Sequence, residues 1–171
     1  MIVLCADQRS PEWARVRLGR LTGSRASDML ATIKSGEAAT RAKYRLQLAT
    51  ERLTGESQED AYTSAAMAWG VEQEPAARVA YEAHTGELVT ECGFLGHDDL
   101  MAGTSPDGLV GEAGCLELKC PQSTTHIGYW RAGGLPSAYR AQVAHHLWIT
   151  GRRWTSLGPP PGVRASRPPG L

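Results

Sequence analysis

The feature that most restricts the fold is a pair of short segments with the pattern of β-strands, residues 109–110 and 115–120, joined by the sequence Gly-Glu-Ala-Gly at residues 111–114. Two extended segments separated by a glycine-rich turn predict a β-hairpin. In such a hairpin Asp107, at the start of the first strand, lies opposite Glu117 in the second.

Three polar side chains converge at one end of this predicted hairpin. Because side chains alternate along a strand, Glu117 and Lys119 share one face, while Leu116 and Leu118 face the core and fix the register. Two carboxylates and an ammonium group at a partly open site suit a hard cation such as Mg²⁺, and Lys119 can orient or deprotonate a water bound to it. Pro-Asp-Gly alone is a common turn and Glu-x-Lys a common solvent-facing pattern, so the spacing carries the prediction.

The remaining segments alternate between helical and extended patterns, which implies an α/β sandwich on a small mixed β-sheet. Gly70 and Pro75 predict that one helix is kinked or split in two. The tail, residues 158–171, holds five of the ten prolines and is predicted to be irregular. Helices are expected at about residues 11–18, 26–30, 40–53, 65–84, 124–131 and 137–149, and further strands at 88–95, 101–104 and 152–157.

The net charge is zero but unevenly distributed: residues 1–52 carry +5, residues 53–118 carry −12 and residues 119–171 carry +7. An acidic centre between basic flanks suits a metal-dependent enzyme acting on a polyanion, although charge blocks are as often solvated surfaces. The sequence has no apolar run long enough for a membrane span and no secretory leader, so we expect a cytoplasmic protein without a membrane partner. Its four cysteines lack a CxxC pair and are predicted to be reduced thiols. Trp13, Trp69 and Trp148 are predicted core residues.

Taken together, these motifs resemble lambda exonuclease and the YqaJ-type viral recombinases of the PD-(D/E)xK nuclease superfamily. The resemblance covers about residues 8–157 and implies a restriction-endonuclease-like core, with a small mixed β-sheet flanked by helices, in a nuclease domain at residues 1–157. The residues that carry it are 105–109 (SPDGL), 117–121 (ELKCP), 139–143 (YRAQV), 147–150 (LWIT), 13–19 (WARVRLG), 22–24 (TGS) and the acidic helix around 68–78.

The resemblance also implies roles for individual residues. Asp107, Glu117 and the backbone carbonyl of Leu118 would hold Mg²⁺, for which Mn²⁺ can substitute, and Lys119 would act on the attacking water. Glu74 would complete the site from its helix, with a second metal as one way of doing so. The positions that match the family's pocket for a 5′ phosphate are Arg17, Ser24, Ser105 and Gln142. These four offer many hydrogen-bond donors and no negative charge, as a terminal phosphate requires.

The implied function is a Mg²⁺-dependent DNA exonuclease of a phage-type recombination system, which digests linear double-stranded DNA in the 5′-to-3′ direction and leaves 3′ overhangs. The implied partners are double-stranded DNA ends, two further copies in a homotrimer and a single-strand annealing protein, in a bacterial host that carries the gene on a phage or prophage.

Two alternatives remain open: an endonuclease of the same superfamily, and a truncated, catalytically impaired DNA-binding remnant. The second arises because family members continue past the strand at Trp154 with a further strand and a closing helix, whereas here residues 158–161 read GPPP. The C-terminal part is therefore expected to be truncated and the chain less stable than a complete relative. A glycosidase using Asp107 and Glu117 is disfavoured because it leaves Lys119 unexplained.

Overall fold

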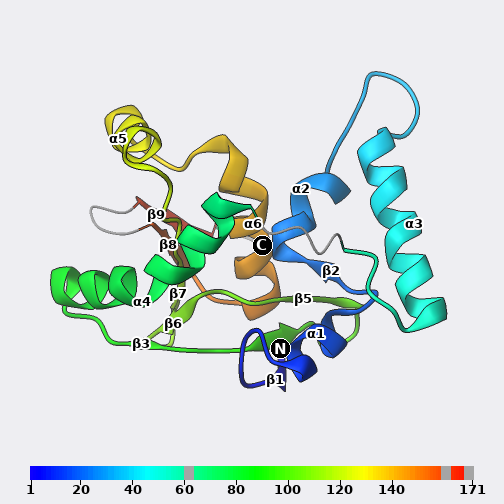
Figure 1. Cartoon of the computed structure of the whole chain (residues 1–171), viewed down its shortest axis with the longest axis horizontal. Helices are drawn as coiled ribbons and strands as arrows, with labels where there is room; N and C mark the ends of the chain where they lie inside the picture. Colours follow the sequence, from blue (N-terminus) through cyan, green and yellow to red (C-terminus); the bar gives the residue numbers. More distant parts are fainter. Residues whose placement is uncertain (60–63, 159–162, 168–171) are drawn as a thin grey trace. The chain divides into compact units, whose positions relative to one another are not determined.

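The computed structural model describes residues 1–59, 64–158 and 163–167 (Figure 1). The chain forms two compact units, and each unit is assembled from three separate stretches of sequence. Unit 1 comprises Met1–Asp60, Cys92–Ser105 and Ala141–Gly151, and unit 2 comprises Ala61–Glu91, Pro106–Arg140 and Arg152–Leu171. Each unit has its own mixed β-sheet, so the strands predicted for one small sheet are divided between two.

Unit 1 is built on a four-stranded sheet with the order β1-β4-β5-β2, in which only β2 and β5 run parallel. Its strands are β1 (Ile2–Cys5), β2 (Leu21–Thr22), β4 (Phe94–Gly96) and β5 (Ala102–Thr104). Its helices are α1 (Pro11–Arg17), the 3₁₀ turn η1 (Gly23–Arg25), α2 (Ala26–Met29), α3 (Ala39–Thr54) and the greater part of α6 (Ser137–Thr150).

The helix ends of unit 1 follow from local chemistry. The Ser10 hydroxyl accepts a hydrogen bond from the backbone N–H of Trp13 at 3.0 Å, and Pro11 occupies the first turn of α1. Gly55 ends α3 in the left-handed conformation, with φ at 71°. These boundaries confirm the start predicted for the first helix and the glycine stop predicted for the third.

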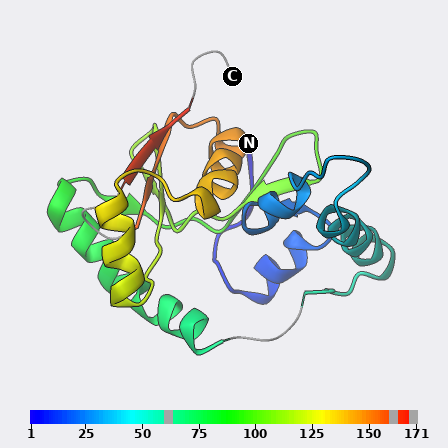
Figure 2. The same ribbon diagram turned by 90° about the horizontal axis from the view of Figure 1, so that it is seen from above.

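Unit 2 is built on a five-stranded sheet with the order β3-β6-β7-β8-β9. Neighbouring strands are antiparallel except for β7 and β8, which run parallel and are joined through α5 and α6. The strands are β3 (Val89–Thr90), β6 (Gly108–Val110), β7 (Gly114–Glu117), β8 (Trp154–Leu157) and β9 (Val163–Ser166), and the helices are α4 (Ala65–Thr85) and α5 (Ser123–Ala132). Figure 2 gives a second view of these elements.

The predicted hairpin is present as β6 and β7. Gly108 pairs with Leu116 and Leu109 with Cys115, and this antiparallel register places Asp107 across from Glu117. Strand β7 ends at Glu117, so Lys119 follows the strand and does not lie within it.

The core of unit 2 lies between the hairpin and α4. Ala77 and Tyr81 of α4 pack with Val110, Leu116 and Leu118, and Leu116 is completely buried. Burial of an apolar side chain of this size is worth about 1.5–3 kcal/mol, so the end of β7 that carries Glu117 is anchored against the helix.

Two sequence predictions about these elements need correction. Helix α4 continues through Gly70 and Pro75, so the split alternative is wrong. The strand predicted at residues 88–95 is two strands, β3 and β4, that belong to different sheets. Gly93 lies between them, and a Cβ there would overlap the backbone of Cys5 and Ala6, so only glycine allows this close approach.

The prediction of an irregular tail is wrong for residues 163–166, which form β9. This strand pairs antiparallel with β8, and the Arg164 guanidinium lies 3.7 Å from the centroid of the Trp154 ring. An edge strand bonds through its backbone on one side only, so a proline-free stretch of four residues suffices. The prolines of the tail lie at residues 159–162 and 168–171, outside the described part of the chain. Among the described residues, no helix has the length and apolar character needed to cross a bilayer.

Candidate active site

The polar side chains predicted to meet at the hairpin do so, within unit 2. The Lys119 ammonium lies 2.7 Å from Oε1 of Glu117, and the Glu117 side chain is buried. The backbone N–H of Leu118 donates to Oδ2 of Asp107 at 2.6 Å. One hydrogen bond and one ion pair therefore hold both carboxylates in place at the end of β7.

Helix α4 places Glu74 beside this pair. Ala77 and Tyr81 lie on the buried face of α4, and Glu74 precedes them by three and seven residues, which puts it on the same face. The negative charge of Glu74 raises the pKa of Asp107, and it adds to burial in raising the pKa of the Cys120 thiol. Glu74 is therefore within electrostatic reach of the end of β7.

The site concentrates negative charge in a poorly solvated place. Burial, and then repulsion from Glu117, raise the pKa of Asp107 well above its usual range, while the hydrogen bond from Leu118 opposes the rise. Burial alone would lower the pKa of Lys119, but its partner Glu117 and the nearby Asp107 outweigh burial and raise it. The lysine is consequently held as a cation beside Glu117.

The donor set fits a divalent cation of the Mg²⁺ type. Within the described residues, no group of three or more His, Cys, Asp or Glu side chains has the arrangement to hold a metal ion by itself. Mg²⁺ does not require such a cage, since it is usually bound through one or two carboxylates and keeps several waters. Asp107 and Glu117 supply two carboxylates whose repulsion a cation would relieve.

The four residues predicted to bind a 5′ phosphate all belong to unit 1. Arg17 stacks on Trp13, with its Cζ 4.0 Å from the ring centroid, and the Trp13 indole N–H donates to the Ser105 hydroxyl at 2.8 Å. These contacts link Arg17 and Ser105 through one aromatic ring. Ser24 is exposed, with its hydroxyl 3.3 Å from that of Thr22, and Gln142 lies half-buried on α6.

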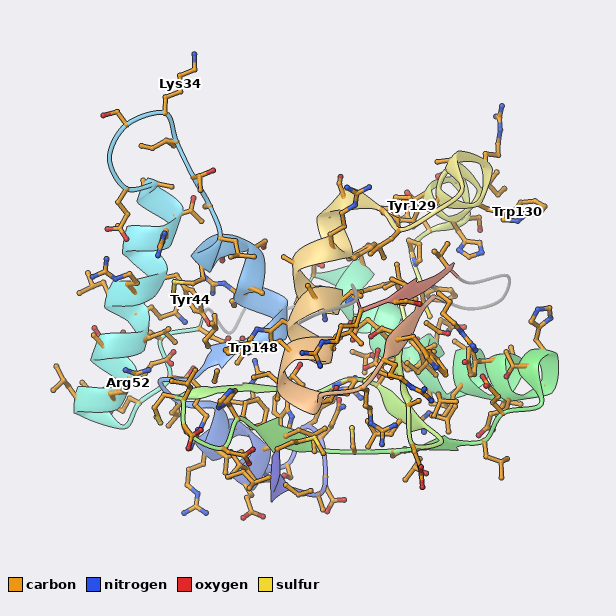
Figure 3. The ribbon with its side chains drawn as sticks, turned by 180° about the vertical axis from the view of Figure 1, so that it is seen from behind. Lys34, Tyr44, Arg52, Tyr129, Trp130 and Trp148 are labelled. Carbon is orange, nitrogen blue, oxygen red and sulfur yellow. The ribbon has the colours of Figure 1, made fainter. Side chains whose placement is uncertain are left out.

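Arg17 also lines a pocket of about 190 Å³ in unit 1, whereas Ser24, Ser105 and Gln142 are not among its lining residues. Tyr44 of α3, labelled in Figure 3, is part of its wall, and the Tyr44 hydroxyl accepts a hydrogen bond from the backbone N–H of Thr22 at 3.3 Å. Glu59 lies at the same pocket, 3.5 Å from the Arg17 guanidinium. The structure thus brings Arg17 and Ser105 together through Trp13, and the pocket that Arg17 lines does not include the other three residues.

Sequence reasoning missed the role of Trp13, which was predicted to be core. It is half-buried and connects the two candidate phosphate ligands. Its spacing four residues before Arg17 on one helix could have indicated the contact. The core prediction is wrong for Trp69 and Trp148, which are 49% and 42% exposed.

Comparison with known proteins decides the family. The model of the YqaJ-like viral recombinase domain matches residues 12–153, a stretch that includes segments of both units. The chain belongs to the YqaJ-like viral recombinase family. The comparison with curated proteins found no match.

Solved structures agree with this family. The alkaline exonuclease LHK-Exo from Laribacter hongkongensis is 36% identical, with a TM-score of 0.80 over 93% of this chain and 83% of that one. The complex of LHK-Exo with dAMP gives 38% identity and a TM-score of 0.81 over the same shares. A phage related exonuclease from Haemophilus somnus is 13% identical and matches in fold alone, with a TM-score of 0.60 over 81% of this chain and 66% of that one. The YqaJ-like domain and its exonuclease neighbours indicate a nuclease, a hydrolase that acts on DNA.

Proposed function

We propose that this YqaJ-family chain is a Mg²⁺-dependent exonuclease that digests one strand of linear double-stranded DNA from its 5′ end and leaves 3′ overhangs. The observation that carries the proposal is the ion pair of Glu117 with Lys119 beside Asp107, at the end of β7. The LHK-Exo relative is an alkaline exonuclease with a structure containing dAMP, a nucleoside monophosphate of the kind this reaction releases.

In this proposal the residues of unit 2 carry out the hydrolysis. Asp107 and Glu117, with the Leu118 carbonyl and Glu74, would hold the cation. When bound, Mg²⁺ stabilises charge that develops on the phosphate and lowers the pKa of a bound water. Lys119, fixed 2.7 Å from Glu117, orients the attacking water. The water oxygen bonds to phosphorus as the bond from phosphorus to the 3′ oxygen breaks. The proton that the water loses passes to solvent, and solvent protonates the departing 3′ oxygen, which leaves as a 3′-hydroxyl.

The residues of unit 1 would make the enzyme end-directed. Arg17, Ser105, Ser24 and Gln142 would hold the 5′ phosphate, with Trp13 fixing the Arg17 side chain. A terminal phosphate carries more negative charge than an internal one, so a guanidinium with hydroxyl donors favours a strand end. Recognition of the end and hydrolysis are thus assigned to different residues, which can be changed separately.

One panel of substrates tests the proposal. Linear duplex with 5′ phosphates, the same duplex dephosphorylated, and closed circular duplex are each incubated with the protein, with and without Mg²⁺. We expect rapid digestion of the phosphorylated duplex, slower initiation on the dephosphorylated one and no product from the circle. Digestion of the circle would support the endonuclease alternative. Salt-dependent DNA binding with no product that requires Mg²⁺ would support the impaired remnant.

Arg17→Ala should slow initiation on phosphorylated ends more than it slows later cleavage. The expected loss is about 10- to 150-fold, as for one charge-assisted contact of 1.5–3 kcal/mol. The dephosphorylated duplex is the control, because the variant and the wild type should make the first cut on it at similar rates. An equal decrease in the initiation rate on phosphorylated and dephosphorylated ends would show that Arg17 does not bind the 5′ phosphate.

The assembly and setting implied by the resemblance complete the proposal: a homotrimer that cooperates with a single-strand annealing protein, in the cytoplasm of a bacterium carrying the gene on a phage or prophage. Sedimentation of the purified chain tests the first of these, and a monomer at micromolar concentration would contradict it.

A further inference from the structure

A second pocket, in unit 2, lies directly beside Lys119 and takes no part in holding the metal. It has a volume of about 140 Å³, and its walls come from α5, the start of α6 and the ends of β8 and β9. None of the described residues that line it is acidic. It is lined by four aromatic rings, those of His126, Tyr129, Trp130 and Tyr139.

One lysine joins this aromatic pocket to the carboxylate site. The Lys119 ammonium lies 5.4 Å from the centroid of the Tyr139 ring and 2.7 Å from Oε1 of Glu117. Tyr139 meets Tyr129 edge to face, with ring centroids 6.0 Å apart. A ligand in the pocket would therefore be separated from the proposed scissile phosphate only by the side chain of Lys119.

The aromatic residues of α5 have no role in the core. No residue of α5 is buried, and Trp130 is 64% exposed. Figure 3 labels Tyr129 and Trp130 on this helix. Gly133 and Gly134, which follow the helix with positive φ, contribute no side chains that would close the pocket. Exposed, closely spaced rings around a cavity are typical of surfaces that stack nucleobases.

We propose that this aromatic pocket binds one nucleobase of the DNA strand being digested, next to the phosphodiester that is cleaved. The inference rests on the proposed nuclease function. Stacking suits the task because every base has a π-face, so an exonuclease can accept each nucleotide in turn without reading its edges. The basic and aromatic lining fits a base joined to a phosphate, since Lys119 neutralises charge while the rings cover the base.

Binding of 5′-phosphorylated oligonucleotides in EDTA tests this without requiring hydrolysis. The probes are an intact strand and strands with one abasic residue at the first, second or third position from the 5′ end. In the wild type, one abasic position should weaken binding by about 5- to 150-fold. Trp130→Leu should bind the intact strand more weakly than the wild type does, by a similar factor. On the abasic strand that weakens wild-type binding, the variant and the wild type should bind equally. Trp130→Phe should keep most of the affinity.

Ile127→Ala is the matched control, because Ile127 is 50% exposed on the same helix and is not among the pocket residues. It should bind every probe as the wild type does. Unchanged affinity of Trp130→Leu for the intact strand would contradict the proposal that the pocket binds a base. The proposal would also be contradicted if the substitution and the abasic residue weakened binding independently, so that their two factors multiplied. If the two changes weaken binding through the same contact but the protein releases no product with Mg²⁺, the nuclease proposal is contradicted and the proposal that the pocket binds a base is supported.

Discussion

At the scale of single residues, the spacing of the chemical groups was predictable and their electrostatic state was not. The ten-residue step from Asp107 to Glu117 brings the two carboxylates together because a β-hairpin fixes the register. The sequence does not indicate that Glu117 is buried or that Lys119 is paired with it, since both depend on how α4 covers the hairpin. Trp13 shows the same limit in part: its stacking with Arg17 is local, but its hydrogen bond to Ser105 joins it to a distant segment.

A buried histidine of unit 1 predicts a pH dependence of stability. Burial lowers the pKa of His145 to about 4, His146 adds to the effect, and the hydrogen bond to the Gly103 carbonyl at 2.9 Å opposes it. In the unfolded chain a histidine titrates near 6.5, so the unfolded state takes up the proton first as the pH falls. The free energy of unfolding should therefore decrease between about pH 6.5 and pH 4, by up to about 3 kcal/mol.

Urea unfolding at several pH values measures this effect against His145→Gln, which can still donate a hydrogen bond to the Gly103 carbonyl but does not titrate. The difference in unfolding free energy between wild type and variant should change with pH only across that window. A constant difference from pH 7 to pH 4 would show that His145 is protonated equally in both states.

At the scale of elements, helices with clear caps and the central hairpin were predictable, and strands that depend on distant partners were not. Ser10 and Gly55 give α1 and α3 their ends through local hydrogen bonds and backbone conformation. Strand β1, which was not predicted, exists because it pairs with β4 some ninety residues later in the sequence. Strand β9 likewise depends on β8.

The close packing of the hairpin that carries Glu117 leads us to expect that adding one methyl group at Gly114 destabilises the protein. A Cβ at Gly114, the first residue of β7, would overlap the ring of Trp154 on the neighbouring strand β8. Gly114→Ala should lower the free energy of unfolding by about 1–3 kcal/mol, the usual cost of overpacking. Thermal or urea denaturation measures it.

Gly70→Ala is the matched control, because Gly70 lies inside α4 with open space around the position of a Cβ. It should stabilise the protein by about 0.5–1 kcal/mol, since alanine favours helix and restricts the unfolded chain. Equal effects of the two substitutions would contradict the packing described for β7 and β8.

At the scale of the whole molecule, the candidate groups separate by unit. The residues proposed for hydrolysis, Glu74, Asp107, Glu117 and Lys119, all belong to unit 2, and those proposed for the 5′ phosphate all belong to unit 1. The sequence predicted one nuclease domain and gave no sign of this division, because each unit is assembled from three discontinuous segments. The family match, residues 12–153, includes segments of both units.

The most direct test of the central claim, that Asp107 and Glu117 hold the catalytic cation beside Lys119, is the rate at which Glu117→Gln digests linear 5′-phosphorylated duplex in Mg²⁺. The substitution keeps the shape of the side chain and removes its charge. We predict a loss of at least about a thousandfold, in line with the several kcal/mol that a metal ion contributes, with an unchanged circular dichroism spectrum. A folded Glu117→Gln protein that digests the duplex at the wild-type rate would contradict the claim.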